Sequence, residues 1–304
     1  MKEFIKKISI FSLILSAIII FISSIINYTL DPYGLIGSIS NDYKTEPNMR
    51  SLKNWYISEN NLKQLNLFFS NSRGGTYIFK DSSYYNMSYS MGVTPQFHED
   101  IKDHIDNGVD IKSIIIMIDE LSIYNDGEMH AAQPLRKKYN KKDLFSFFMI
   151  PPSGEKILDI FSPKNKKHIK FNLKKDGSQE YKNFNISQSL DTIQIQIPIT
   201  YPSLKTKKAF YDLKKLINYL NSKNIDAYIG IHPISYYNFQ KNTDKIIQLK
   251  SLVSLLNTNN IKCFNNLTII NDNEQKALFY DSNHYSPVLA KLVIDQLIQY
   301  ENKK

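Results

Sequence analysis

The amino-acid sequence predicts an α/β protein: a three-layer α/β/α sandwich with a mostly parallel sheet, preceded by one N-terminal transmembrane helix. Two observations lead to this prediction. Short apolar runs typical of buried strands alternate with segments of helical periodicity, a pattern typical of parallel sheets covered by helices. An uncharged apolar run also stands near the N-terminus, with the length that a helix needs to cross a bilayer.

The transmembrane helix is predicted from residues 8–26, which are rich in isoleucine and carry no charge. A signal peptide has a shorter apolar region, about 7–15 residues, and a cleavage site between small residues. Residues 25–29 offer no such site, so we expect an uncleaved anchor within residues 1–30. The alternative is a buried core helix. The run is preceded by Lys2, Lys6 and Lys7, so the positive-inside rule places the N-terminus in the cytoplasm and exports the remainder.

The composition excludes some classes of function. The chain has one cysteine, Cys263, so it holds no intramolecular disulfide, and we expect this thiol to be a small buried hydrophobe. The formal net charge is +9, but the lysines are scattered and an exported domain would not meet nucleic acid, so we expect no nucleic-acid partner. Two basic clusters, residues 136–142 and 164–167, either face anionic lipid or polymer or lie in solvated loops. We expect neither a metal nor a cofactor.

Residues 31–60 form a polar juxtamembrane segment, and residues 61–304 form the predicted α/β domain. The apolar run 65–69 gives way abruptly to small polar residues and glycines, which predicts a strand that ends in a tight turn. The run 97–106 is rich in His and carboxylates, but its two histidines are six residues apart and do not share a helix face. An amphipathic crossover helix explains it better than a metal site. Residues 114–118 predict the next strand.

The alternation of strand and helix lapses between about residues 121 and 200. Residues 169–173 alternate between apolar and polar, residues 176–177 indicate a turn, and residues 193–197 alternate strictly. We expect an inserted, partly β region that could cover the site and would carry substrate specificity. The alternation then resumes with helices predicted near 210–220, 246–256 and 289–297 and strands at 227–231 and 261–264.

Two motifs suggest a hydrolytic site. Asp281 precedes His284 by three residues in a polar turn that opens the last helix, so one loop can present an imidazole and the carboxylate that orients it. Ser72 lies just after the strand at 65–69, at the end of a parallel strand where open α/β sheets bind ligands. Turn amides there could stabilise an oxyanion. The alternatives are a helix-start aspartate and a surface turn rich in serine and glycine.

In the order of these motifs the chain resembles the SGNH/GDSL hydrolase superfamily. It is similar in particular to the membrane-anchored SGNH-like proteins of bacterial cell envelopes, many of which accompany machinery that acylates polysaccharide or teichoic acid. In those proteins the serine often stands in a Gly-x-Ser-Arg turn, and here the turn is Ser70-Asn71-Ser72-Arg73. The resemblance implies a triad of Ser72, Asp281 and His284.

The resemblance also identifies a second motif at residues 85–92, in which Asn86, Ser88 and Gly92 are candidate oxyanion residues. Ser88 stands where the superfamily has a glycine, and the strand at 114–118 is not followed by the expected Gly-x-Asn. The chain is therefore expected to keep only part of the oxyanion hole, and the loss of one donor typically costs about a hundredfold or more in rate.

Three further residues are candidates for the pocket. Arg73 follows the serine, Asp119 follows a strand that should end near Ser72, and His232 ends another strand before a proline. The alternatives are a salt-bridged or solvated carboxylate for Asp119 and a structural histidine for His232.

These motifs predict a membrane-anchored serine esterase or O-acyltransferase that acts on a cell-envelope glycan or polymer, in the bacterial periplasm or at the cell surface. A membrane-bound acyltransferase is a candidate partner. An alternative is an inactive or weakly active accessory protein of the same fold that presents polymer to a separate membrane acyltransferase. A third alternative, a binding domain without acyl chemistry, requires Ser72, Asp281 and His284 to lie apart.

Overall fold

The computed structural model describes residues 1–30, 49–60, 62–89, 92–119, 122–123, 171–181, 208–258, 260–264, 269–270, 278–279 and 284–301. The chain forms two compact units. One includes Met1–Tyr56, and the other includes Ile57–Pro134 and Phe171–Lys304.

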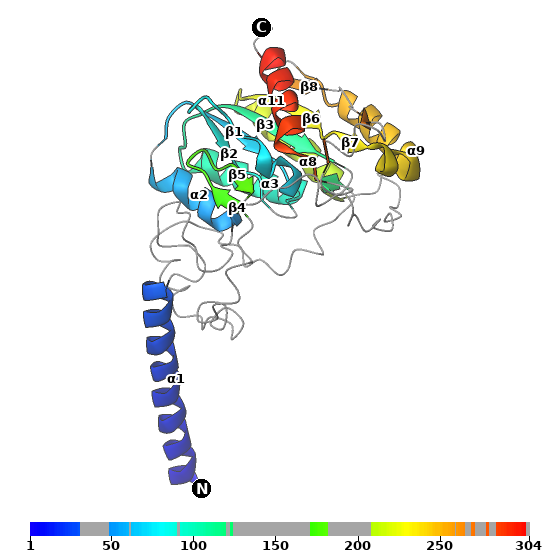
Figure 1. Cartoon of the computed structure of the whole chain (residues 1–304). Coiled ribbons are helices and arrows are strands. Elements are labelled where there is room, and N and C mark those ends of the chain that lie inside the picture. The colour runs from blue at the N-terminus through cyan, green and yellow to red at the C-terminus, as the bar shows by residue number, and fades with distance from the viewer. Residues whose placement is uncertain are drawn as a thin grey trace. The chain divides into compact units, whose positions relative to one another are not determined.

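The N-terminal helix α1 spans Lys2–Leu30 (Figure 1). Its segment Glu3–Ile26 is long and apolar enough to cross a membrane, and almost none of it is buried. A helix in the core of a soluble domain would be mostly buried, so the exposure favours a membrane span over that alternative. A second helix, α2, spans Met49–Glu59 in the segment that the sequence analysis treats only as polar.

A five-stranded parallel sheet forms the centre of the second unit (Figure 1). Its strands are β1 (Leu65–Phe69), β2 (Tyr84–Asn86), β3 (Ile111–Ile118), β6 (Asp226–Ile231) and β8 (Ile261–Phe264). Their order is β2-β1-β3-β6-β8, and every neighbouring pair is parallel. The predicted α/β class with a mostly parallel sheet is therefore confirmed. The strand order reverses direction between β1 and β3, and open α/β sheets bind ligands at such a point.

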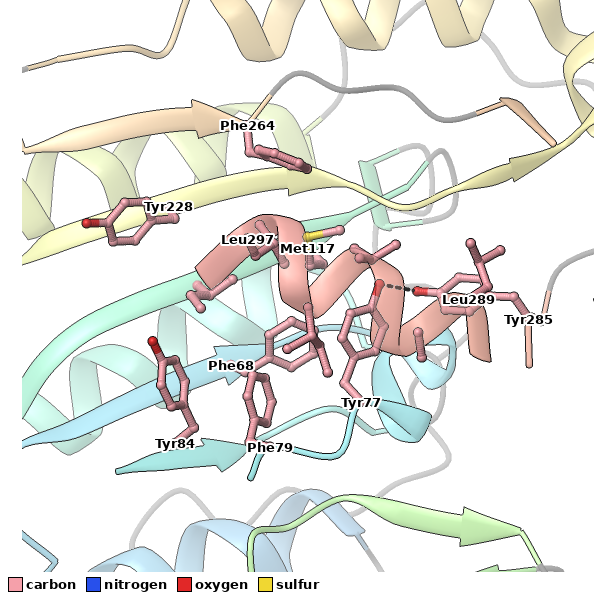
Figure 2. Close-up of a cluster of buried hydrophobic side chains, with 14 of the residues drawn as sticks. Phe68, Tyr77, Phe79, Tyr84, Met117, Tyr228, Phe264, Tyr285, Leu289 and Leu297 are labelled. Carbon is pink, nitrogen blue, oxygen red and sulfur yellow. Dashed lines mark hydrogen bonds between the residues drawn. The ribbon is translucent and has the colours of Figure 1, made fainter. Parts of the chain in front are cut away.

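The last helix, α11 (Pro287–Glu301), packs on one face of this sheet. Its Leu289 and Leu297 join an apolar cluster with Phe68 of β1 and Met117 of β3 (Figure 2). Burial of each such side chain contributes about 1.5–3 kcal/mol relative to exposure. This helix therefore ties the C-terminus to the middle of the sheet.

Neighbouring side chains of a strand point to opposite faces. Phe69 therefore faces away from Phe68, and its ring contacts that of Phe97 in α3 (Thr94–Asp106) at 5.9 Å between ring centroids. Helix α8 (Lys208–Ser222) lies beside α3, joined by a 2.7 Å bond from Thr94 Oγ1 to the Ala209 carbonyl. The crossover helix predicted at 97–106 and the helix predicted at 210–220 are confirmed.

The remaining elements modify the predicted pattern. Helix α9 spans Tyr236–Ser254 with a break at Asn242, so it begins well before the helix predicted at 246–256. The short strands β7 (Ile234–Ser235) and β9 (Ile269–Ile270) form a parallel pair that the sequence analysis missed.

Part of the predicted insertion is a hairpin of β4 (Phe171–Leu173) and β5 (Gln179–Tyr181). Its turn contains Gly177 at φ +78°, a conformation that side chains with a Cβ rarely adopt, which confirms the turn predicted at 176–177. The alternating run at 193–197 and the basic clusters at 136–142 and 164–167 lie outside the described residues.

Candidate functional site

Ser72 begins a short 3₁₀ helix, η1 (Ser72–Thr76), that leaves the C-terminal end of β1. Asn71 caps this helix: its side-chain oxygen accepts a 3.0 Å hydrogen bond from the Arg73 amide. A capping asparagine satisfies an amide that the helix itself leaves unpaired. The polar residues after β1 thus turn the chain at the switch point of the sheet, where the strand order reverses between β1 and β3. Ser72 remains partly exposed there.

His284 lies next to Ser72 although 212 residues separate them in the sequence. The Ser72 hydroxyl and His284 Nε2 are 2.9 Å apart, and both residues are partly exposed. This is the distance that a general base needs to take the proton of a nucleophile. The third member of the predicted triad, Asp281, lies outside the described residues.

A buried ionic network lies directly behind Ser72. Arg73 Nε is 3.1 Å from Asp119 Oδ2, and both side chains are almost fully buried. Asp119 also accepts hydrogen bonds from Asn71 Nδ2 at 2.6 Å and from the Ser122 amide and hydroxyl, each at 2.7 Å. Burial alone would raise the pKa of Asp119, but the Arg73 charge and these hydrogen bonds hold it below its usual range. Asp119 therefore braces the turn as a buried carboxylate.

Asn86, the predicted start of the second motif, secures the other end of η1. Its Nδ2 donates 2.9 Å hydrogen bonds to the carbonyls of Gly74 and Tyr77, and its Oδ1 accepts from the Ser88 amide at 2.8 Å. The Gly92 amide donates to the Tyr89 carbonyl at 3.2 Å. The Ser88 amide, which stands where the superfamily has its oxyanion glycine, and the amide of the candidate Gly92 are thus already engaged.

The Ser72 amide differs from that of Arg73 in the hydrogen bonds that the described residues make. In the part of the chain that the structure describes, no group accepts a hydrogen bond from the Ser72 amide, whereas the Arg73 amide is used by Asn71. The Ser72 amide belongs to the same residue as the candidate nucleophile, as one donor of an oxyanion hole commonly does.

His232 is fully buried, so it lies beneath the site and not on its surface, where a pocket residue would be. Its Nε2 is 2.5 Å from the Ser70 hydroxyl and its Nδ1 is 2.5 Å from the Tyr285 hydroxyl. The Tyr285 hydroxyl in turn donates to that of Tyr77 at 2.7 Å (Figure 2). Ser70, Tyr77 and Tyr285 were not among the predicted site residues, because no local pattern connects residues so far apart in the chain.

The β4–β5 hairpin packs against the same turn. The Asp176 carbonyl accepts from the Asn86 amide at 2.6 Å, and Asp176 Oδ2 accepts from the Phe79 amide at 3.1 Å. The buried side chain of Gln179 lies over Gly75 of η1, since a Cβ built on that glycine would come within 2.6 Å of Gln179 Oε1. The described part of the insertion therefore supports the Ser72 turn.

The described residues contain no group of three or more His, Cys, Asp and Glu side chains that could hold a metal. His104 of α3 is buried and His98 is partly exposed. Burial lowers the pKa of His104 to about 4, so this imidazole is neutral near pH 7. Cys263 is buried, as expected.

No protein-family model matches the chain, and no curated protein matches it.

Proposed function

We propose that this protein is a membrane-anchored serine esterase or O-acyltransferase of the SGNH type, with a three-layer α/β/α domain outside the cytoplasm. The observation that carries the proposal is the 2.9 Å contact between the Ser72 hydroxyl and His284 Nε2 at the switch point of a parallel sheet. Helix α11 on one sheet face and α3 on the other support the three-layer arrangement.

The chemistry follows from this contact. His284 Nε2 takes the hydroxyl proton while Ser72 Oγ bonds the ester carbonyl carbon, and the carbonyl oxygen becomes an oxyanion near the Ser72 amide. The C–O bond to the alcohol then breaks, and His284 returns the proton to the leaving alcohol. An acyl group remains on Ser72, and His284 next activates either water or a sugar hydroxyl to remove it. Asp281 is the proposed carboxylate that orients His284.

The proposed substrate is an acyl ester on a cell-envelope polysaccharide or other polymer. Helix α1 supports this choice because a membrane anchor keeps the site close to the envelope surface. The three lysines before the apolar run support export of the domain, to the bacterial periplasm or the cell surface. A membrane-bound acyltransferase remains the proposed partner for acyl supply.

A second candidate is an accessory protein that holds polymer without acyl chemistry of its own. It is favoured by one specific observation: the Ser88 amide, which stands in place of the superfamily's oxyanion glycine, already donates to Asn86 Oδ1. The sequence also lacks the Gly-x-Asn whose asparagine would be a further donor, so the oxyanion hole lacks two of its expected donors. A site with so few donors would be slow, since each donor contributes about a hundredfold or more in rate.

The two candidates differ in ester turnover. We would give the full chain in detergent micelles nitrophenyl esters of short acyl groups, with and without an oligosaccharide acceptor. Release of nitrophenol that Ser72→Ala abolishes supports the enzyme, and acceptor-dependent acylation identifies transfer. Turnover that Ser72→Ala leaves unchanged would contradict it, and the absence of any turnover in the folded protein would favour the accessory function.

A further inference from the structure

A buried chain of hydrogen bonds runs beneath the Ser72–His284 pair. It starts at the Ser70 hydroxyl, passes through both ring nitrogens of His232, and reaches the hydroxyl of Tyr285, with each step 2.5 Å long. All three side chains have no more than 1% of their surface exposed. These hydrogen bonds therefore connect the ends of β1 and β6 with the segment that precedes α11.

The position of these residues in the sequence is informative. Ser70 precedes Ser72 by two residues, and Tyr285 directly follows His284. The same two segments are thus joined twice, once by the exposed Ser72–His284 contact and once by the buried link through His232. Two connections of this kind restrict rotation and sliding of one segment against the other, which a single hydrogen bond does not.

Tyr285 is itself held firmly. Its ring packs edge-on against those of Tyr77 and Phe279, with centroids 5.9 Å apart in both pairs. A β-bridge joins it to Phe279, and its hydroxyl donates to Tyr77. Tyr77 is the residue that ends η1, so Tyr285 also reaches the far end of the turn that Ser72 begins.

The direction of the hydrogen bonds is consistent along the chain. Because the Tyr285 hydroxyl donates to Tyr77, its oxygen accepts from His232 Nδ1–H. In a neutral imidazole with its proton on Nδ1, Nε2 then accepts from the Ser70 hydroxyl. Burial lowers the pKa of His232 to about 3, with Asp119 opposing the shift, so the ring stays neutral in any ordinary buffer.

Ser70 and His232 could also be regarded as a second nucleophile and base. Both residues are completely buried, however, so no ester carbonyl can approach the Ser70 hydroxyl. Their hydrogen bond therefore has a geometric role.

We propose that His232 is a positioning residue for the Ser72–His284 pair: by bonding Ser70 and Tyr285 at once, it fixes the two segments at the separation that proton transfer requires. This inference rests on the proposed function. It predicts that loss of the link lowers the reactivity of Ser72 in a folded protein, because a misplacement of about 1 Å can cost about a hundredfold in rate.

The test measures how fast a fluorophosphonate labels Ser72 in the full chain in detergent micelles. In this reaction Ser72 Oγ bonds phosphorus, fluoride leaves, and the hydroxyl proton goes to His284. The main variant is Tyr285→Phe, which keeps the ring and removes the hydroxyl that His232 bonds. His232→Phe, which removes both bonds of the link, is the second variant.

The matched control is Tyr89→Phe. It makes the same chemical change at another buried tyrosine, whose hydroxyl donates to Asp100 of α3 at 3.2 Å and not to the link. Urea midpoints are measured for all variants, and labelling is compared where each is more than 99% folded. A purely structural role then leaves the labelling rate unchanged.

We expect Tyr285→Phe and His232→Phe to lower the rate constant for labelling by about tenfold or more, while Tyr89→Phe stays within about twofold. Wild-type rates in both link variants would overturn the inference and leave the proposed function intact. An equal loss in Tyr89→Phe would also overturn it. A folded wild-type protein that takes no label would overturn both.

Discussion

The buried ion pair between Arg73 and Asp119 permits a quantitative prediction, with Asp119→Asn as the perturbation. In the wild type three donors bond the Asp119 carboxylate: Asn71 Nδ2 at Oδ2, and the Ser122 amide and hydroxyl at Oδ1. An asparagine offers one acceptor oxygen, so its NH₂ group must face at least one of these donors. The guanidinium of Arg73, which lies 3.1 Å from Oδ2, also loses its ion pair with Asp119.

The expected loss of folding stability in Asp119→Asn is large, because the side chains of Arg73 and Asp119 are both almost fully buried. Removing one member of a buried ion pair typically costs about 3–5 kcal/mol in the free energy of unfolding. We would measure urea unfolding of the full chain in micelles by near-ultraviolet circular dichroism, which reports on the packing of the buried tyrosines. The double variant Arg73→Met/Asp119→Asn should lose about 1 kcal/mol less than the sum of the two single variants.

The effect should also depend on pH in a defined direction. The pKa of folded Asp119 is held below its usual range, so its stabilisation is complete above the unfolded value of about 3.9 and is lost as pH falls through the folded value. The difference in the free energy of unfolding between wild type and Asp119→Asn should therefore be constant from about pH 5 to 8 and shrink below about pH 4. A loss under about 1 kcal/mol, or a difference that does not narrow in acid, would refute this reasoning.

Three further predictions concern other parts of the molecule. Burial lowers the pKa of His104 to about 4, so this group alone should reduce the free energy of unfolding of the wild type by about 2 kcal/mol between pH 8 and 5. In His104→Leu, urea unfolding should show a decline that is smaller by this amount. Gly74→Ala should lower the free energy of unfolding by about 1–3 kcal/mol and slow the labelling of Ser72, because the new Cβ would lie 2.4 Å from the Cβ of Ser70. Gly75→Ala is the control, because its close contact is with the flexible end of the Gln179 side chain. The full chain should stay in the membrane fraction after an alkaline carbonate wash, and release by the wash would contradict the assignment of α1 as a span.

Much of the fold could be predicted from local patterns. The apolar runs at 65–69 and 227–231 predict β1 and β6, because strands of a parallel sheet are buried on both faces and read as continuous hydrophobic segments. Helices α3 and α8 follow from their periodicity. The short pair β7–β9 and the early start of α9 could not be predicted, since two-residue strands and polar helix starts have no distinctive pattern.

The candidate site, like the fold, could be predicted only in part from local patterns. The spacing of Ser72 and His284 relative to a strand end and a helix start is a local signal, and the structure brings these two side chains together. The links from Ser70 to His232 and from Tyr77 to Tyr285 join residues 162 and 208 positions apart, and only the folded chain brings them into contact. Asn86 was assigned to the oxyanion by resemblance, and in the structure its side chain holds η1.

The central claim is that His284 activates Ser72. The most direct measurement treats the full chain in micelles with a fluorophosphonate, digests it, and locates the added mass by fragmentation, which distinguishes Ser72 from the nearby Ser70. The account predicts an adduct on Ser72 that disappears in Ser72→Ala and forms about a hundredfold or more slowly in His284→Ala. A folded protein without an adduct, or an adduct that forms equally fast without His284, would contradict it.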